Sequence, residues 1–365
     1  MVEWKKLGEV CTKITDGSHN PPIGVDYSLN RMISSQNVYN GHIDFSSVRY
    51  LSDADFEKEN KRTNAKKGDV VLTIVGTIGR CCVLDGNEGN IAFQRSVALL
   101  KPSNAIKSSF LMHYLINNNK HLNSQSNGGA QKGIYLKQLE RILIPIPSLS
   151  EQNRIVGILD TFTASIDNLK EQIAQRRKQY EYYRDELLDL EGKEGVEMKI
   201  EDFCQLKAGK SIKTEDISVE NNGCDYPCYG GNGIRGYVHF YSHDGEFPII
   251  GRQGALCGCV NWAIGKFYAT EHAVVAKGNN KVCQRFLLHL FQHANLNQYK
   301  TQGAQPGLSV AKLNEISFVI PSLQEQQRIV SILDTFEGSI QNLEAQLEQR
   351  QKQYEYYRNK LLTFE

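Results

Sequence analysis

Apolar residues recur with a 4-3 spacing along two long segments of the chain. In the first segment the pattern comprises Ile155, Leu159, Phe162, Ile166, Leu169, Ile173, Tyr180, Tyr183, Leu187 and Leu190, interrupted only by Arg176. In the second it comprises Ile329, Leu333, Phe336, Ile340, Leu343, Leu347, Tyr354, Tyr357, Leu361 and Phe364, interrupted only by Arg350. Five heptads with one polar exception predict a coiled-coil seam on each of two helices. The two arginines either fix the register of the seam or extend their charged ends into water.

Both segments carry matching helix-start signals. Ser148 with Glu151, and Ser322 with Glu325, form capping-box patterns directly after a proline. A helix of about 40 residues is about 60 Å long, which is more than one small domain buries. This length favours packing of the two helices on each other, most simply as an antiparallel coiled coil with the globular segments at opposite ends. The alternative is that each stripe packs only on its own globular segment.

The two helical segments are near copies of each other. Residues 147–191 align with residues 321–365 at a constant offset of 174, and 30 of the 45 positions are identical. Fainter matches occur upstream, where Gly129-Ala130-Gln131 recurs as Gly303-Ala304-Gln305. The chain therefore reads as an internal pseudo-two-fold repeat. Its predicted parts are a globular domain at 1–146, a helix and linker at 147–195, a second globular domain at 196–320 and a second helix at 321–365.

Both globular segments read as strands followed by one helix. The strand-like runs are at 69–75 and 91–100 in the first segment, and at 247–251 and 267–276 in the second. The helical stretches are at 108–122 and 282–296. This order predicts an α+β fold and not a doubly wound sheet. His113 and His289, which match between the repeats, are interpreted as packing residues of these apolar helices.

The distribution of charge along the chain says more about DNA binding than the net charge of +1 does. Residues 1–146 and 196–320 carry net charges of +5 and +1, whereas the two helical segments carry −3 and −2. Positive surface therefore belongs to the globular segments, and this bias fits DNA contact there.

The loops of the globular segments are rich in Gly, Asn, Gln and Ser. Such side chains pair with base edges, and glycine lets the backbone approach phosphate, although the same residues are common in plain turns. With the cationic residues beside these loops, the candidates for DNA contact are Ser18, His19, Asn20, Arg80, Arg95, Gln131, Lys132, Lys210, Ser211, Asn232, Arg235, Arg252, Gln253 and Gln305.

The sequence predicts neither catalysis nor a metal site in this chain. Gly209-Lys210-Ser211 lacks the first glycine of a phosphate-binding loop, and Asn20-Pro21-Pro22 is followed by Ile23 and not by an aromatic residue. The nine cysteines suit free thiols, and the spacing of Cys224, Cys228, Cys257 and Cys259 is not that of a zinc knuckle. With no leader or long apolar run, we expect a cytoplasmic protein.

The order of globular segment, P-S-L-x-E-Q-x-R-I-V-x-I-L-D helix, globular segment and the same helix resembles the specificity subunits of type I restriction-modification enzymes. The resemblance covers nearly the whole chain and rests mainly on the two helical segments. The start Trp4-Lys5-Lys6-Leu7-Gly8-Glu9-Val10, the run Gly68-Asp69-Val70-Val71-Leu72 and the Gly-Ala-Gln turns support it.

The resemblance implies a non-catalytic subunit with two target-recognition domains, each of which reads one half of a bipartite gapped DNA site. It further implies two adenine-N6 methyltransferase subunits and translocase-nuclease subunits as partners. S-adenosylmethionine, ATP and magnesium would act on those partners and not on this chain. The main alternative is a coiled-coil scaffold or adaptor that does not bind DNA, suggested by the near-zero net charge. A degenerate nuclease or methyltransferase is the weaker alternative.

Overall fold

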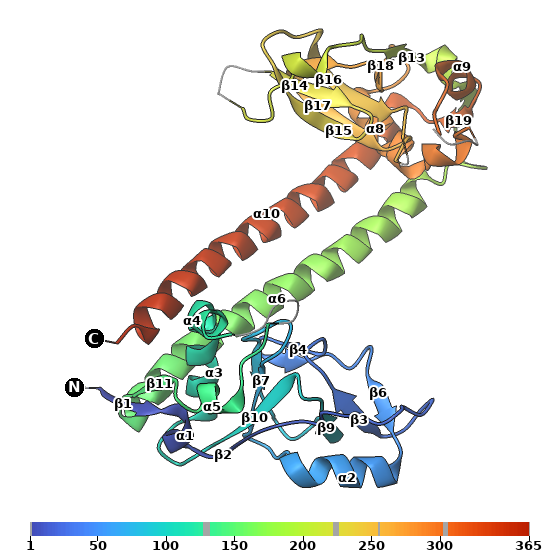
Figure 1. The fold of residues 1–365 in the computed structure, drawn as a ribbon. Helices are drawn as coiled ribbons and strands as arrows, with labels where there is room; N and C mark the ends of the chain where they lie inside the picture. The colour runs from blue at the N-terminus through green and yellow to red at the C-terminus, as the bar shows by residue number, and fades with distance from the viewer. Residues whose placement is uncertain (1, 127–131, 222–225, 255, 302–305, 365) are drawn as a thin grey trace. The chain divides into compact units, whose positions relative to one another are not determined.

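The computed structural model describes residues 2–126, 132–221, 226–254, 256–301 and 306–364, which form helices and sheets (Figure 1). The chain divides into two compact units. Unit 1 comprises Met1–Leu169 and Gln346–Glu365, and unit 2 comprises Lys170–Ala345. Each unit therefore contains one globular segment and a part of each long helix.

The strands of unit 1 are β1 Glu3–Lys6, β2 Cys11–Asp16, β3 Asn30–Ile33, β4 Val38–Tyr39, β5 His42–Ile43, β6 Arg49–Leu51, β7 Val70–Thr73, β8 Cys81–Val83, β9 Asn90–Phe93, β10 Val97–Pro102 and β11 Leu143–Ile146. A four-stranded antiparallel sheet has the order β2-β10-β7-β8. A three-stranded sheet has the order β6-β3-β9, in which β3 and β9 are parallel. The pairs β1–β11 and β4–β5 complete the set.

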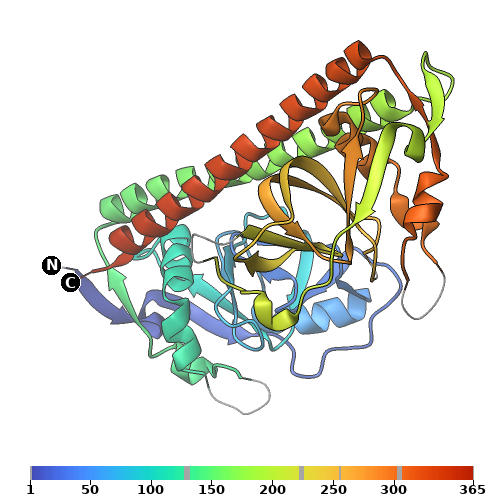
Figure 2. The ribbon, with the colours of Figure 1, turned by 90° about the horizontal axis from the view of Figure 1, so that it is seen from above.

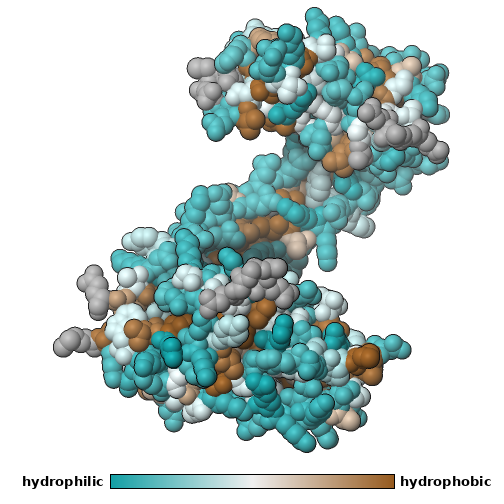
Figure 3. Space-filling model, viewed as in Figure 1, coloured by the Kyte–Doolittle hydropathy of each residue, from teal (hydrophilic) through white to brown (hydrophobic). Residues whose placement is uncertain are grey.

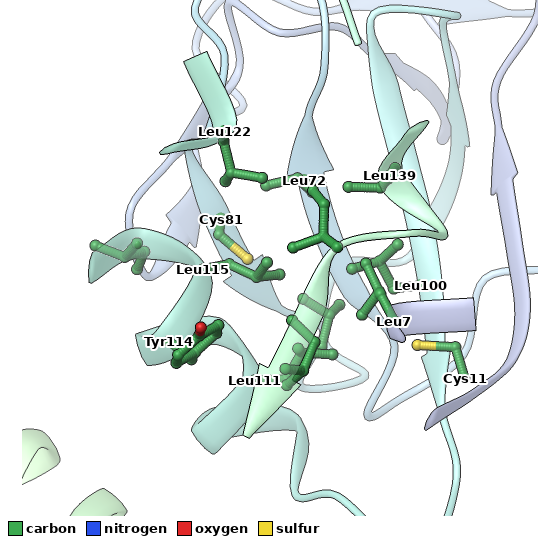
Figure 4. Close-up of a cluster of buried hydrophobic side chains, with 14 of the residues drawn as sticks. Leu7, Cys11, Leu72, Cys81, Leu100, Leu111, Tyr114, Leu115, Leu122 and Leu139 are labelled. Atoms are coloured by element: carbon green, nitrogen blue, oxygen red, sulfur yellow. The ribbon is translucent and has the colours of Figure 1, made fainter. Parts of the chain in front are cut away.

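The short helices of unit 1 are α1 Leu7–Val10, α2 Asp53–Thr63, α3 Ser108–Asn117, α4 Asn119–Ser124 and α5 Leu136–Leu139. Figure 4 shows apolar side chains from several of these elements converging on one core. Leu72 and Leu100 come from neighbouring strands, Leu111 and Leu115 from α3, and all four are fully buried. This core fixes α3 on the four-stranded sheet.

The strands of unit 2 are β12 Val196–Lys199, β13 Cys204–Ala208, β14 Tyr226–Gly230, β15 Gly233–Val238, β16 His243–Gly251, β17 Val260–Ala269, β18 Ala273–Gly278 and β19 Ser317–Ile320. A six-stranded sheet has the order β13-β18-β16-β17-β14-β15, and β12 pairs with β19. The helices are α7 Ile200–Phe203, η1 Thr214–Asp216, α8 Gln284–His293, η2 Leu296–Tyr299 and α9 Val310–Asn314. Phe286 and Phe291 of α8 are fully buried in the core with Ile250 and Val274 of the sheet.

The predicted order of strands followed by a helix is present in both units, but several predicted elements are interrupted. The run predicted at 91–100 is two strands, because the polar turn at 94–96 separates β9 from β10. The run at 267–276 is divided in the same way between β17 and β18. The helix predicted at 108–122 breaks at Asn118, and α2 was not predicted at all because Ala54 and Phe56 are the only apolar residues in its sequence.

The two long helices are α6 Leu149–Leu188 and α10 Leu323–Leu362, each of 40 residues. Their first turns are capped by Ser148 and Ser322, whose hydroxyls accept from backbone N–H groups three residues later at 3.2 and 3.3 Å. The heptad pattern was extended too far, since Leu190 and Phe364 lie beyond the helix ends. No helix among the described residues is long and apolar enough to cross a membrane.

Within unit 1, the beginning of α6 packs beside the end of α10 (Figures 1 and 2). Ile155 and Leu159 share the unit 1 core with Leu362. Further along α6, the ring of Phe162 lies 6.4 Å from Tyr354 and 5.4 Å from Tyr357. Residues later in α6 therefore contact residues earlier in α10. In this unit, α6 touches both its own globular segment and the other helix.

Unit 2 repeats this packing with the roles of the helices exchanged. Ile329 and Leu333 of α10 share the unit 2 core with Leu188. The ring of Tyr183 stacks on Phe336 at 5.3 Å, and Arg177 forms an ion pair with Glu344. Here too the contacts run in opposite directions along the two helices.

The seam residues differ in burial along the helices. Those that are buried are Ile155, Leu159, Ile166, Ile173, Ile329 and Leu333. Those that are half-buried are Phe162, Leu169, Arg176, Tyr180, Leu187, Phe336, Ile340, Leu343, Leu347, Arg350, Tyr354 and Leu361. Tyr183 and Tyr357 remain 42% and 41% exposed, because each stacks one ring face and leaves the other to solvent. Near the helix ends, Leu188, Leu190 and Leu362 are buried.

The two arginines of the predicted seam occupy equivalent places. The guanidinium of Arg176 lies 5.7 Å from the ring centre of Phe336, and that of Arg350 lies 5.7 Å from the ring centre of Phe162. Each is half-buried and contacts an aromatic side chain of the other helix. A cation–π contact therefore accompanies the polar interruption in each unit.

Candidate nucleic-acid interface

In unit 1, the loop after β2 is fixed against the turn between β9 and β10. The backbone N–H of Gly17 donates to Val97 O at 3.2 Å, and that of Ser18 donates to Phe93 O at 2.7 Å. Arg95 then donates its N–H to Ser18 O at 2.8 Å. A Cβ on Gly17 would lie 1.9 Å from Phe93 O, so this position requires glycine. The predicted residues Ser18 and Arg95 are thus neighbours.

In unit 2, the loop after β13 makes two equivalent backbone contacts. Gly209 donates its N–H to Ala273 O at 3.0 Å, and Lys210 donates to Ala269 O at 3.1 Å. A Cβ on Gly209 would lie 2.0 Å from Ala269 O. Lys210 therefore takes the place in unit 2 that Ser18 takes in unit 1.

A second shared contact joins the loop after β7 to the segment before α5 in unit 1. The N–H of Ile74 donates to Ser96 O at 2.9 Å, and Ile74 O accepts from Ile134 N at 2.9 Å. Two residues later, the backbone N–H of Gly76 donates to Lys132 O at 3.4 Å. The predicted residue Lys132 is thereby held beside the β7 loop.

The loop after β16 repeats this arrangement in unit 2. The N–H of Arg252 donates to His272 O at 3.0 Å, and Arg252 O accepts from Leu308 N at 2.8 Å. Gly254 donates to Pro306 O at 3.1 Å. Each unit therefore presents one set of loops tied by equivalent backbone hydrogen bonds.

We call this set the loop frame: residues 17–18, 34–36, 74–80, 94–96 and 132–134 in unit 1, and 209–210, 230–232, 252–254, 256–259, 270–272 and 306–308 in unit 2. The backbone contacts match, but the side chains at matching positions do not. The matching pairs are Ser18 and Lys210, Gln36 and Asn232, Ile74 and Arg252, Val75 and Gln253, Arg80 and Cys259, Arg95 and Glu271, Ser96 and His272, and Lys132 and Pro306. One backbone scaffold thus displays two different chemistries.

The remaining predicted residues of unit 1 lie on or next to this frame. His19 is exposed, and its Nε2 lies 2.9 Å from the buried carboxylate of Asp16, which Arg62 also contacts. Asn20 is exposed. The guanidinium of Arg80 lies 4.7 Å from the ring centre of Tyr39 and donates to a backbone carbonyl, so this cation is already engaged within unit 1.

In unit 2 the frame surrounds a concavity of about 760 Å³. The predicted residues Asn232, Arg235 and Gln253 line it together, and Arg252 is adjacent in sequence to Gln253. Arg235 also donates to Thr214 Oγ1 at 3.1 Å. The buried Nε of Arg252 has no hydrogen-bond partner among the described residues.

Other predicted residues lie outside this concavity or outside the described residues. Lys210 and Ser211 are exposed at the end of β13, where their carbonyl oxygens accept from the hydroxyl of Tyr268 at 3.3 Å. Gln131 and Gln305, with the Gly-Ala-Gln turns that contain them, lie outside the described residues. In the view of Figure 3, hydrophobic residues form separate patches on a mainly hydrophilic surface.

The cysteines do not gather into a ligand set among the described residues. Burial raises the pKa of Cys11, Cys82 and Cys204 to about 12, which keeps them as thiols. Cys224, part of the spacing considered for zinc, is outside the described residues.

One set of side chains in unit 2 has the geometry of a metal site: His289, Asp334 and Glu337. Arg285 occupies its anionic side, donating to Asp334 Oδ1 at 2.8 Å and to Glu337 Oε2. The arginine supplies the positive charge that a metal would otherwise bring. We therefore assign this group to the attachment of α8 to α10.

The attachment of the globular segments to the long helices is shared between the units. His113 and His289 are buried, and their Nε2 atoms lie 2.8 and 2.9 Å from Asp160 and Asp334. Both histidines are thus packing residues, as the sequence predicts, and each also forms a hydrogen bond to a long helix.

A fully buried glutamine strengthens each attachment. Gln152 accepts the N–H of Lys107 at 2.8 Å and donates to Ala105 O and Pro147 O. Gln326 makes the equivalent three bonds to Cys283 N, Lys281 O and Pro321 O at 2.9–3.0 Å. The repeated Glu-Gln pair in the helical motif is the sequence signal for this residue.

Polar side chains of the loop frame that sequence reasoning missed include Ser35, Gln36, Ser96, Glu271 and His272. Ser96, Glu271 and His272 occupy short turns inside runs that read as continuous strands, whereas Ser35 and Gln36 lie outside every predicted element, so no local pattern marks any of them. The oxygen Oγ of Ser96 accepts from Ser35 N at 3.0 Å, and Nε2 of His272 lies 3.3 Å from Glu271 Oε1. Long-range backbone pairing is needed to place them.

Comparison with known proteins agrees with this repeated organisation. The type I restriction modification DNA specificity domain matches residues 1–176 and again 193–350. The EcoprrI type I restriction enzyme specificity subunit of Escherichia coli is 36% identical over 288 residues, covering 74% of this chain and 71% of that protein. The EcoR124I/EcoR124II specificity subunit of the same species is 30% identical over 281 residues, covering 67% and 68%.

A solved structure is also similar over the whole chain. The crystal structure of the S subunit of a type I restriction-modification system from M. genitalium has a TM-score of 0.67 at 16% identity, and the match covers 100% of this chain and 97% of that one. This likeness shows a common fold. Together with the two matches of the specificity domain, it places this chain in the family of type I restriction-modification DNA specificity subunits.

Proposed function

We propose that unit 1 and unit 2 each read one half of a bipartite, gapped DNA site. The observation that carries this proposal is the loop frame, in which equivalent backbone hydrogen bonds present different side chains. Two readers built on one scaffold would recognise different bases in similar orientations. The candidate residues of the frame then act as base-edge and phosphate contacts.

In this proposal α6 and α10 form one continuous antiparallel coiled coil that sets the unread spacer between the half-sites. Two observations support this. Within each unit, residues later in one helix contact residues earlier in the other, and the rings of Tyr183 and Phe336, and of Phe162 and Tyr357, are stacked. Since a rigid separation between readers selects one half-site spacing, changing the length of both helices should change the spacer.

The chain itself would perform no catalytic step. By its family, its partners would be two adenine-N6 methyltransferase subunits, and translocase-nuclease subunits for restriction. S-adenosylmethionine, ATP and magnesium would bind to those subunits. Because the relatives are bacterial proteins, whose DNA lies in the cytoplasm, we place the complex there.

The experiment is genome-wide detection of N6-methyladenine in cells that express the methyltransferase partner with or without this chain. We expect methylation at one bipartite, gapped motif that disappears when this chain is absent. Insertion of one heptad in both helices should move the preferred spacer. Unchanged methylation without this chain, with the methyltransferase present, would contradict the proposed function.

A further inference from the structure

The concavity of unit 2 is lined by glycine backbone and by a set of polar side chains, which we call the rim. Gly230, Gly231, Gly233, Gly254 and Gly307 are five of the eleven described residues that line it. Because these residues carry no side chains, a flat group can approach the backbone closely. The rim carries Asn232, Arg235, Gln253 and His272.

The backbone of Gln253 is held in place by hydrogen bonds of its neighbours, and its side chain is exposed. Its residue forms an antiparallel bridge to Gly307, and hydrogen bonds from Arg252 N to His272 O and from Gly254 N to Pro306 O hold both neighbours. Its side chain is exposed and has no hydrogen bond to any other described residue. The amide is therefore positioned by the sheet while its donor and acceptor are available to a ligand.

The turn that carries Asn232 packs directly on this backbone. A Cβ on Gly231 would lie 2.8 Å from Gln253 O, so the turn approaches Gln253 as closely as glycine allows. Oδ1 of Asn232 lies 3.8 Å from Cys259 Sγ, a weak contact that orients the amide. Two carboxamides thus belong to one wall of the concavity.

The charges of the rim favour a neutral, hydrogen-bonding ligand group over a phosphate. His272 is paired with the carboxylate of Glu271 at 3.3 Å, and Arg235 is the one Lys or Arg among the described lining residues. A carboxamide presents a donor beside an acceptor, which complements N7 and the N6 amino group of adenine.

We propose that this concavity is a nucleobase-reading subsite, in which Gln253 reads an adenine of the half-site assigned to unit 2. The inference rests on the proposed function and deepens it by naming a specificity-determining residue. Unit 1 has Val75 at the matching frame position, and a valine cannot form these hydrogen bonds. The two half-sites would therefore differ at the base read from this position.

The test is competition binding of the complete complex to duplexes substituted at every position of both half-sites. Gln253→Ala should reduce discrimination at one adenine about tenfold or more and leave the other positions unchanged. Gln253→Glu, which keeps the size but replaces the donor with an acceptor, should shift the preference at that position toward cytosine. Val75→Ala is the matched control and should leave the discrimination at that adenine as it is in the wild-type complex.

The outcomes separate this inference from the proposed function. If the wild-type complex shows no sequence preference, the proposed function itself fails. If the wild type is selective but Gln253→Ala leaves every position unchanged, or relaxes a base other than adenine, the subsite assignment is wrong. Because Gln253 is exposed, its truncation should leave the thermal unfolding midpoint within about 2 °C of wild type. A folded Gln253→Ala complex that loses selectivity at all positions would also overturn the assignment.

Discussion

Unit 1 and unit 2 hold their loops with matching backbone hydrogen bonds, yet the side chains on those loops differ in charge and polarity. Arg95 of unit 1 corresponds to Glu271 of unit 2, and Val75 corresponds to Gln253. The attachments to the long helices vary less, since a histidine–aspartate pair and a buried glutamine recur in both units. Backbone geometry is therefore kept where loops must be positioned, while the side-chain chemistry changes where DNA would be read.

The largest effect is expected at the glycines that begin the loop frame. Gly17→Ala and Gly209→Ala would each place a Cβ about 2 Å from a carbonyl oxygen, and the backbone must move to relieve this overlap. We expect each to lower the free energy of unfolding by roughly 3 kcal/mol or more, measured by denaturant titration.

Gly338→Ala is the control for these substitutions. This glycine lies within α10, nothing lies within 4 Å of its added Cβ, and the matching residue of α6 is Ala164. We expect it to raise stability by about 1 kcal/mol. Equal losses at Gly17, Gly209 and Gly338 would show that the close approach in the loop frame is not the cause.

The next effect concerns the buried glutamines of the two attachments. Gln152→Leu and Gln326→Leu each remove partners from one backbone N–H and two carbonyl groups. We expect each substitution to lower the free energy of unfolding by about 2 to 3 kcal/mol, and by similar amounts because the bonds are equivalent. Calorimetric unfolding of both variants checks this, and a large loss at only one glutamine would break the claimed equivalence.

A smaller effect should distinguish the units. Arg285 of unit 2 donates to Asp334 and Glu337 and lies 5.4 Å from the ring centre of Trp262, whereas Ser109 stands at the matching helical position of unit 1. Arg285→Met leaves two part-buried carboxylates without their cation. We expect it to lower the free energy of unfolding by about 1 to 2 kcal/mol. Ser109→Ala should change stability by less than about 0.5 kcal/mol, and equal losses would contradict the asymmetry.

The smallest effect is a pH dependence of unit 2. Burial lowers the pKa of His289 below its usual 6.5, while its hydrogen bond to Asp334 opposes the shift. Below pH 6.5 the unfolded chain therefore binds more protons at this residue, so the free energy of unfolding falls as the pH drops. The slope from one histidine is at most about 1.4 kcal/mol per pH unit. His289→Gln should reduce the slope of stability against pH, and an unaltered slope would contradict this origin.

The sequence predicted the long helices well because their heptads repeat and their start signals are strong. It overextended them to Leu190 and Phe364, since apolar spacing continues where hydrogen bonding stops. The loop positions were only partly predictable. Asn232, Arg235 and Gln253 were found from composition and lie together, but Glu271 and His272 were missed because only long-range strand pairing creates their turn.

The most direct test of the account is to map the methylated motif for complexes altered in the loop frame of one unit at a time. Arg95→Ala changes the frame of unit 1, and Gln253→Ala changes that of unit 2. We predict that each substitution relaxes bases in a different half of the bipartite motif and leaves the other half and the spacer unchanged. Relaxation of both halves by either substitution would contradict independent reading by the two units.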